Sequence, residues 1–180
     1  MFHPNTQALL DHWRMLRKDD AQTPARETLD PAAIAEILTQ VFLLGRNGPD
    51  LPFRLAGGLL TDLHGRGLRG DGFLELWGAP SRAPAREAVL SALRDREPVV
   101  VYADAGAAGG VLGLEILLAP LSGPGGALDR LLGLYQPLTS LAVLRGEPIG
   151  PLAHRFAVRL GAVERPRTRL RLASVDGMRL

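Results

Sequence analysis

Glu115 is the polar residue that fits its surroundings least. It interrupts an apolar stretch from Val111 to Leu121, and a carboxylate buried there without a partner would be strongly unfavourable. An ion pair with Arg54 or Arg66, or a hydrogen bond from the backbone, would satisfy it. A ligand bound in a cavity would do the same, and exposure to solvent is the third interpretation. A structural partner is the simplest of these, and the ligand contact stays open.

His64 stands immediately before a glycine-rich segment. The other three histidines lie near the chain ends or in the first expected helix, so no spacing typical of metal ligands is present. We interpret His64 as an ordinary hydrogen-bonded histidine, with haem or metal ligation as the alternative. No cofactor is indicated by the sequence.

The segment from Gly65 to Gly70 matches the pattern GxGxxG. A dinucleotide site needs such glycines directly after a strand and at the start of a helix. Here they follow an expected helix over residues 59–64, so we predict a loop in which glycines adopt positive φ angles. Its two arginines, Arg66 and Arg69, could still bind an anionic ligand.

Several kinds of chemistry are missing from the sequence. It contains no cysteine, which excludes disulfides, thiolate zinc sites, cysteine nucleophiles and photochemistry that traps a flavin on a thiol. It contains no GxSxG, HExxH or P-loop pattern. A triad assembled from distant parts of the chain is the remaining route to catalysis, and we predict a non-enzymatic protein.

The basic residues gather near the C-terminus. The chain carries a net charge of +2, and residues 145–180 hold eight arginines and three acidic residues, or +5, which leaves −3 for residues 1–144. Four of these arginines alternate with smaller or apolar residues: Arg165, Arg167, Arg169 and Arg171. Such a ribbon suits nucleic-acid phosphates, anionic lipid or an acidic protein surface. A solvated arm is the alternative.

The N-terminal region predicts helices. Asn5 or Thr6 can cap a first helix, in which Leu9, Trp13 and Leu16 share one apolar side. That side is either a dimer or partner surface or packs on the chain's own sheet. Aspartate at 30 and proline at 31 then begin a second helix, which runs through about residue 39.

The middle of the chain predicts one antiparallel sheet. Apolar, β-branched runs separated by turn residues indicate five strands, over residues 41–44, 53–55, 99–102, 111–121 and 130–136. Helical segments at 59–64, 73–77 and from 81 or 83 to 94 would form a layer on one face. We expect an α+β protein with an N-terminal helical segment over 1–40, a core over 41–140 and a basic C-terminal extension over 141–180.

The order and spacing of these signals resemble a bacterial family of stand-alone PAS-type proteins over about residues 10–134. The residues that carry the resemblance are Trp13 with Arg17, Pro24 with Arg26, Asp30-Pro31, Val41-Phe42-Leu43-Leu44, Arg54-Leu55-Ala56-Gly57, Gly65-Arg66 with Leu68 and Gly70, Leu76-Trp77, Glu115 through Pro120-Leu121, and Leu132-Gly133. The resemblance implies a PAS-like, five-stranded antiparallel sheet with short helices on one face and often a small cavity between them. His64 stands where this family usually has an aromatic residue, and Gly67 where a more polar residue is common.

The resemblance also implies a role. PAS domains generally sense a small molecule or pair with other proteins, frequently as dimers. We therefore expect a sensory or regulatory module that binds a small ligand or a regulatory partner and signals by protein association, with a homodimer as the first candidate. A nucleic-acid-associated regulator using the arginine-rich tail is the alternative. The expected ligand-binding residues are Leu59, Leu63, His64, Arg66, Phe73, Trp77, Val101, Glu115 and Leu117.

The first residues and the most apolar stretch of the chain indicate its cellular location. The first five residues have neither the basic flank nor the apolar run of a signal peptide, and the most apolar stretch is short and contains a carboxylate. We therefore expect a cytoplasmic protein without a membrane span.

Overall fold

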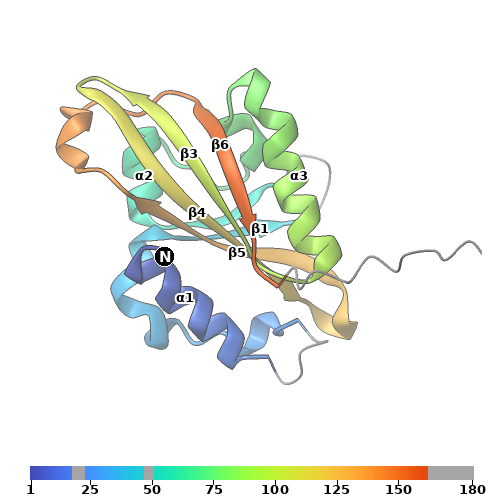
Figure 1. Cartoon of the computed structure of the whole chain (residues 1–180). Coiled ribbons are helices and arrows are strands. Elements are labelled where there is room, and N and C mark those ends of the chain that lie inside the picture. Colours follow the sequence, from blue (N-terminus) through green and yellow to red (C-terminus); the bar gives the residue numbers. More distant parts are fainter. Residues whose placement is uncertain (18–22, 47–50, 162–180) are drawn as a thin grey trace, which may run out of the picture.

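A computed structural model describes residues 1–17, 23–46 and 51–161. Six antiparallel strands form one sheet in the order β2-β1-β5-β4-β3-β6 (Figure 1). Their bounds are β1 Val41–Gly45, β2 Phe53–Ala56, β3 Val99–Ala107, β4 Gly110–Ser122, β5 Leu128–Pro137 and β6 Leu152–Arg159. The five strands expected from the sequence are all present, and the sheet contains one more.

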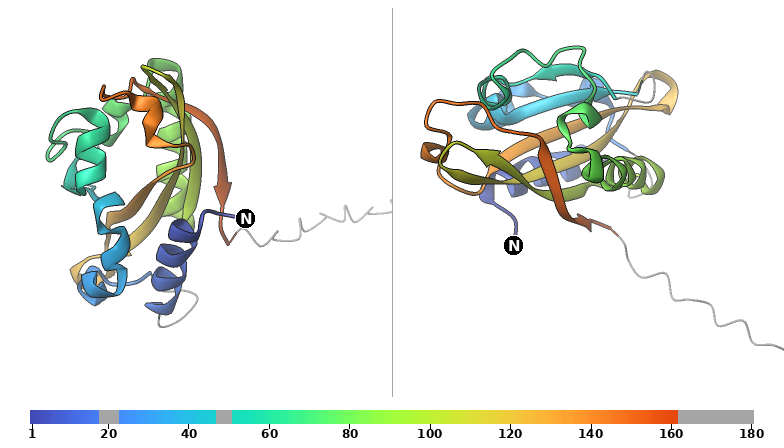
Figure 2. Two further views of the ribbon diagram at one scale, coloured as in Figure 1. Left: turned by 90° about the vertical axis from the view of Figure 1, so that its left-hand side faces the viewer. Right: turned by 90° about the horizontal axis from the view of Figure 1, so that it is seen from above.

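The helices pack on two faces of this sheet, as the two views of Figure 2 show. We call the inner face the one covered by α2 (Gly58–His64), η3 (Phe73–Leu76) and α3 (Ala79–Asp95). The outer face is covered by α1 (Pro4–Met15) and the 3-10 segment η2 (Pro31–Gln40). Three further 3-10 turns are η1 (Arg26–Thr28), η4 (Pro124–Gly126) and η5 (Leu141–Leu144). None of the described helices is long and apolar enough to cross a membrane.

Strand β4 separates two hydrophobic cores. Alternate residues point to opposite faces of a sheet, so Leu114 and Ile116 lie in the inner core while Leu117 and Ala119 lie in the outer core. Both faces are covered, which explains why this strand is apolar without interruption on either side of Glu115.

The sequence predicts the N-terminal cap of η2 correctly but not that of α1. Asp30 caps η2 as expected, because its side chain accepts a hydrogen bond from the backbone N–H of Ala32 at 2.9 Å. The expectation that Asn5 or Thr6 caps α1 is wrong. The helix begins at Pro4, two to three residues earlier than expected, and its cap is His3, whose Nδ1 accepts from the N–H of Asn5 at 3.2 Å.

The expected five-stranded sheet is corrected by β6. The sequence predicts only a basic extension over 141–180, whereas residues 152–159 pair along the free edge of β3. An edge strand needs only one partner and can leave its side chains in water. Most side chains of β6 are exposed, so the strand carries too weak an apolar pattern to be recognised.

Candidate ligand site

Aromatic side chains from five elements meet in the inner core. Neighbouring rings lie 5.6–6.1 Å apart between centroids, mostly edge to face, an arrangement that favours tight packing. They form a continuous set that we call the inner aromatic cluster: Phe42 from β1, Phe53 from β2, His64 from α2, Phe73 and Trp77 from η3 and its cap, and Tyr135 from β5.

Three polar atoms of this cluster lack a hydrogen-bond partner among the described residues. They are His64 Nε2, Trp77 Nε1 and the Tyr135 hydroxyl. Eight buried side-chain atoms in the described part of the chain share this property, but these three fall in one cluster. The second tryptophan shows the usual situation: Trp13 Nε1–H donates to the Pro120 carbonyl at 2.8 Å. A buried polar group without a partner is unfavourable by roughly 1–3 kcal/mol, so three together require an explanation.

The cluster carries no charge at neutral pH. Burial, with a smaller effect from the Arg66 guanidinium, lowers the pKa of His64 to about 4. Burial raises the pKa of the Tyr135 hydroxyl well above its usual value. A tryptophan N–H only donates, whereas a tyrosine hydroxyl and a neutral imidazole both donate and accept. The cluster can therefore hydrogen-bond an uncharged, flat molecule but offers nothing to neutralise an ion.

The expected ligand residues divide between the two faces. Leu63, Phe73, Trp77 and Val101 lie buried in the inner core, with Leu59 partly buried against it. His64 also belongs to this side, because its ring packs edge to face on Tyr135 at 6.0 Å. Arg66 does not contribute, since its side chain is exposed and pairs with Asp71.

Glu115 and Leu117 lie on the opposite side of the sheet from the cluster, which corrects the expected single cavity. In the β3–β4 pair, Val101 stands opposite Ile116 and Tyr102 opposite Glu115. Directly paired residues share a face, so Glu115 goes with Tyr102 to the outer side, and Leu117 packs in the outer core. Because the register between the two strands was unknown, the sequence left the side of Glu115 undetermined.

Glu115 holds the start of α1 rather than a ligand. One carboxylate oxygen accepts from the backbone N–H of His3 at 3.0 Å, and the other accepts from the Tyr102 hydroxyl at 2.7 Å. Neither Arg54 nor Arg66 is its partner. Partial burial, followed by the hydrogen bond and charge of Glu115, raises the pKa of Tyr102 to about 12. Nearby, Asn5 Nδ2 donates to Gln136 Oε1 at 3.0 Å.

The apolar side of α1 packs against the chain's own sheet. Leu9 and Trp13 are fully buried in the outer core, and Leu16 is partly buried. The sequence left two roles open for this apolar side, a partner surface or packing on the chain's own sheet, and the structure shows the packing. While α1 is docked, Leu9 and Trp13 offer no surface to a second protein.

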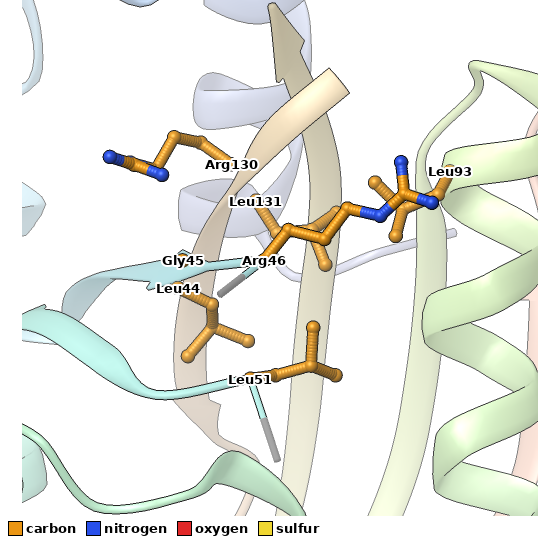
Figure 3. Close-up of a pocket in the computed structure, with 7 residues that line it drawn as sticks. All are labelled: Leu44, Gly45, Arg46, Leu51, Leu93, Arg130 and Leu131. Carbon is orange, nitrogen blue, oxygen red and sulfur yellow. The ribbon is translucent and has the colours of Figure 1, made fainter. Parts of the chain in front are cut away.

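A shallow surface hollow lies between β1, β5 and the C-terminal end of α3, and none of its lining residues belongs to the cluster. Buried leucines form its floor, and Arg46 and Arg130 stand at its sides. Figure 3 shows the Arg46 guanidinium lying toward Leu93 and that of Arg130 pointing the other way. Because the two cations do not converge, the hollow lacks the arrangement of an anion site.

The structure also bears on the expectations about ions and nucleic acid. Gly65 and Gly70 adopt φ angles of +64° and +93° in a loop after α2, as predicted for the GxGxxG segment. No group of three or more metal-ligating side chains occurs among the described residues. The four alternating arginines of the tail lie outside the described part of the chain: Arg165, Arg167, Arg169 and Arg171.

Three members of the cluster were not among the expected ligand residues: Phe42, Phe53 and Tyr135. All three lie on strands that the sequence predicts, and all are fully buried. A tyrosine in the middle of an apolar strand is a usable signal, because a buried hydroxyl needs a partner. Phe42 gives no such signal, since a phenylalanine in a strand is ordinary core.

An antiparallel sheet with several short helices packed on its inner face is the architecture of a PAS-like domain. Residues 1–136 match a family model described as PAS domain, which is more than half of the 180-residue chain. The chain therefore belongs to the PAS domain family. A search of the curated proteins finds no match.

Several solved structures show a similar fold. An RNA-binding light-oxygen-voltage receptor is 18% identical with a TM-score of 0.48, over 70% of this chain and 39% of its own. The LOV protein of Rhodobacter sphaeroides is 20% identical with a TM-score of 0.47, over 63% of this chain and 70% of its own. The light state of the blue-light photoreceptor Aureochrome1 LOV is 17% identical with a TM-score of 0.47, over 67% of this chain and 98% of its own. The chain thus spans well under half the length of the first of these proteins.

Proposed function

We propose that this protein is a non-enzymatic PAS-type sensory module that binds a small, uncharged, hydrogen-bonding ligand at the inner aromatic cluster. The observation that carries the proposal is the set of three polar atoms on His64, Trp77 and Tyr135 that have no partner among the described residues. Phenylalanine or leucine at these positions would fill similar space without the unfavourable burial of a polar group. A ligand that pairs with these atoms gives a physical reason for their presence.

The chemical class of the proposed ligand follows from the residues of the inner aromatic cluster. The rings favour a flat apolar body, and the lack of charge at His64 and Tyr135 disfavours an ion. Trp77 requires an acceptor on the ligand, because an indole N–H cannot accept. The ligand class is thus an uncharged heteroaromatic compound with at least one hydrogen-bond acceptor.

The signal would leave the site through strand β5. Tyr135 faces the cluster, whereas the next residue, Gln136, lies on the outer side and accepts a hydrogen bond from Asn5 of α1. A ligand that shifts Tyr135 thereby changes how firmly α1 is docked on the sheet, provided that the ligand binds the docked and released arrangements of α1 with different affinity. The readout is association with another protein, either a second copy or a regulatory partner.

The test compares two matched tryptophan variants. Trp77→Phe removes an N–H without a partner among the described residues, whereas Trp13→Phe removes an N–H that is bonded to Pro120. Native mass spectrometry and an absorbance spectrum of freshly purified protein report any retained ligand, and urea unfolding reports stability. We expect Trp77→Phe and Tyr135→Phe to lose the retained ligand and Trp13→Phe to keep it. Compared after ligand removal, Tyr135→Phe should be as stable as the parent or more stable, because it removes only the unpartnered hydroxyl. Both tryptophan variants leave a smaller ring in a packed core, so we expect Trp13→Phe to be less stable than Trp77→Phe by about 1 kcal/mol, the contribution of its lost hydrogen bond.

Two results would contradict the proposal. The first is ligand retention that is equal in Trp77→Phe, Tyr135→Phe and the parent protein. The second is a parent protein that retains no ligand and binds none from a panel of uncharged heteroaromatic compounds, including indole and benzimidazole, in ligand-observed NMR.

A further inference from the structure

Residues 138–151, which we call the strap, connect β5 to β6 and lie beyond the part of the chain that matches the PAS family model. Figure 1 shows the strap in orange, passing through η5 on its way from one strand to the other. Because β5 and β6 are separated in the sheet by β4 and β3, the strap must cross the end of the β3–β4 hairpin.

Backbone hydrogen bonds fasten the strap at three places. At its start, the Leu138 N–H donates to Gly113 O of β4 at 2.8 Å. At the hairpin, the Gly109 N–H donates to Val143 O and the Gly150 N–H to Gly106 O, each at 2.8 Å. At the end of α2, the Ile149 N–H donates to Leu63 O at 2.8 Å. The Pro148 ring lies against Gly65, since a Cβ built on that glycine would come within 2.5 Å of it.

These fastenings place the strap against the inner core at the end of α2. Ile149 is 9% exposed as part of the inner core, and the residue whose carbonyl it binds, Leu63, directly precedes His64. Just after the strap, Leu152 of β6 accepts from the Gly78 N–H at 2.9 Å, and Gly78 directly follows Trp77. The strap therefore covers the inner core at the end of the helix that carries His64.

The strap buries fewer side chains than the helices that cover the inner core. Helix α3 buries six residues and α2 two, whereas Ile149 is the one buried side chain of the strap, all of which the structure describes, with Val143 and Leu144 partly buried against the core. The backbone turns through positive φ angles at Arg145 (+53°) and Gly146 (+83°). A segment with few buried contacts opens at lower free energy than a packed helix.

We propose that the strap is the gate of the ligand site: it opens by releasing Ile149 from Leu63, admits the ligand to His64 and Trp77, and closes over it. This inference rests on the ligand site proposed above. The gate lies outside residues 1–136, which match the family model.

The absence of cysteine from the sequence makes the gate testable with one engineered disulfide. A Cβ built on Gly65 lies 3.2 Å from the Cβ of Pro148, close to the roughly 3.5–4.5 Å found across disulfides. In the double variant Gly65→Cys, Pro148→Cys, oxidation locks the strap to α2 and reduction frees it. Each single-cysteine variant controls for the substitutions themselves.

The readout is the exchange of the two indole N–H protons with solvent deuterium, followed by NMR on full-length ¹⁵N-labelled protein. We expect oxidation of the double variant to slow exchange at Trp77 by about tenfold or more and to leave Trp13, on the outer face, unchanged. Equal exchange at Trp77 in the oxidised and reduced protein, or equal slowing at both tryptophans, would overturn the proposal.

A second variant keeps the test decisive if the cysteine pair does not fold. Ile149→Ala removes the strap's single buried side chain and should speed exchange at Trp77 several-fold relative to Trp13. No acceleration at Trp77 would count against the gate. Since neither measurement uses a ligand, failure of the gate is distinct from failure of ligand binding, which the retention experiment tests.

Discussion

His64, Trp77 and Tyr135 each place a polar atom where the described part of the chain provides no partner. Such positions lower stability, because the atom has lost its bond to water and gained none in return. Trp13 and Glu115 show that the same chain satisfies large buried groups on the outer side, the first at Pro120 and the second at Tyr102 and His3. Thr6 Oγ1, His12 Nε2 and Gln40 Oε1, on the segments that cover the outer face, lack a partner as well. What distinguishes the inner aromatic cluster is that its three unpartnered atoms belong to one set of rings packed on one another.

His64 also predicts how stability depends on pH. Its pKa is lowered from 6.5 to about 4 in the folded protein by burial and by Arg66. Between these values the unfolded chain binds a proton that the folded chain does not, so His64 makes the protein less stable as the pH falls from 6.5 toward 4. The full effect is at most about 3 kcal/mol.

The variant His64→Phe should remove this part of the pH dependence. We expect the difference in unfolding free energy between parent and variant, measured in urea, to move in favour of the variant as the pH falls from 7 to 4.5. His154, whose pKa burial also lowers, is present in both proteins and cancels. A difference that stays constant with pH would show that His64 is not held neutral by burial.

At the scale of elements, the pairing of β1 with β5 positions the cluster, and this pairing needs a glycine opposite Phe42. Gly133 stands opposite Phe42 in the sheet, and a Cβ at this glycine would lie only 2.0 Å from the Phe42 ring. The missing side chain lets the ring lie across the neighbouring strand and reach Phe73 and Tyr135. The position of the cluster thus depends on strand pairing as well as on ring packing.

A matched pair of glycine variants tests this dependence. Gly133→Ala forces Phe42 out of place and should destabilise the protein by about 1–3 kcal/mol, as overpacking does. Gly58→Ala, at the first residue of α2 with open space around it, should change stability by less than about 1 kcal/mol. Urea unfolding compares the two, and equal small effects would show that the Phe42 ring is free to move.

The elements were largely predictable from the sequence, whereas the site was predictable only in part. Apolar runs and turn residues located β1 to β5 and the three inner helices, because pattern and spacing are local properties. The exposed side chains of β6 hid it. The register of β3 on β4 is set by the two-residue turn between Ala107 and Gly110, and the glycine-rich segment 106–110 left the position of that turn open. A shift of one residue exchanges the two faces, so Glu115 and Leu117 were grouped with a cluster on the other side. Tyr135 was missed although its strand was found.

At the scale of the whole molecule, one sheet separates two differently built halves. The outer half is fastened by specific bonds, from Trp13 to Pro120 and from His3 and Tyr102 to Glu115. The inner half is filled with rings and closed by the strap. The proposed signal passes from the inner half through Tyr135 and Gln136 to α1, so docking of that helix is where ligand binding would become visible to another protein.

The chain's two tryptophans report directly on whether a ligand occupies the inner aromatic cluster. The indole N–H resonances of Trp77 and Trp13 are compared by NMR in freshly purified protein and in protein stripped of ligand by unfolding and refolding. A ligand acceptor paired with Trp77 predicts a downfield shift of its indole proton in the purified protein, with Trp13 unmoved because it is already bonded to Pro120. An unchanged Trp77 resonance in protein shown by native mass spectrometry to carry a ligand would place that ligand elsewhere and contradict the proposed site.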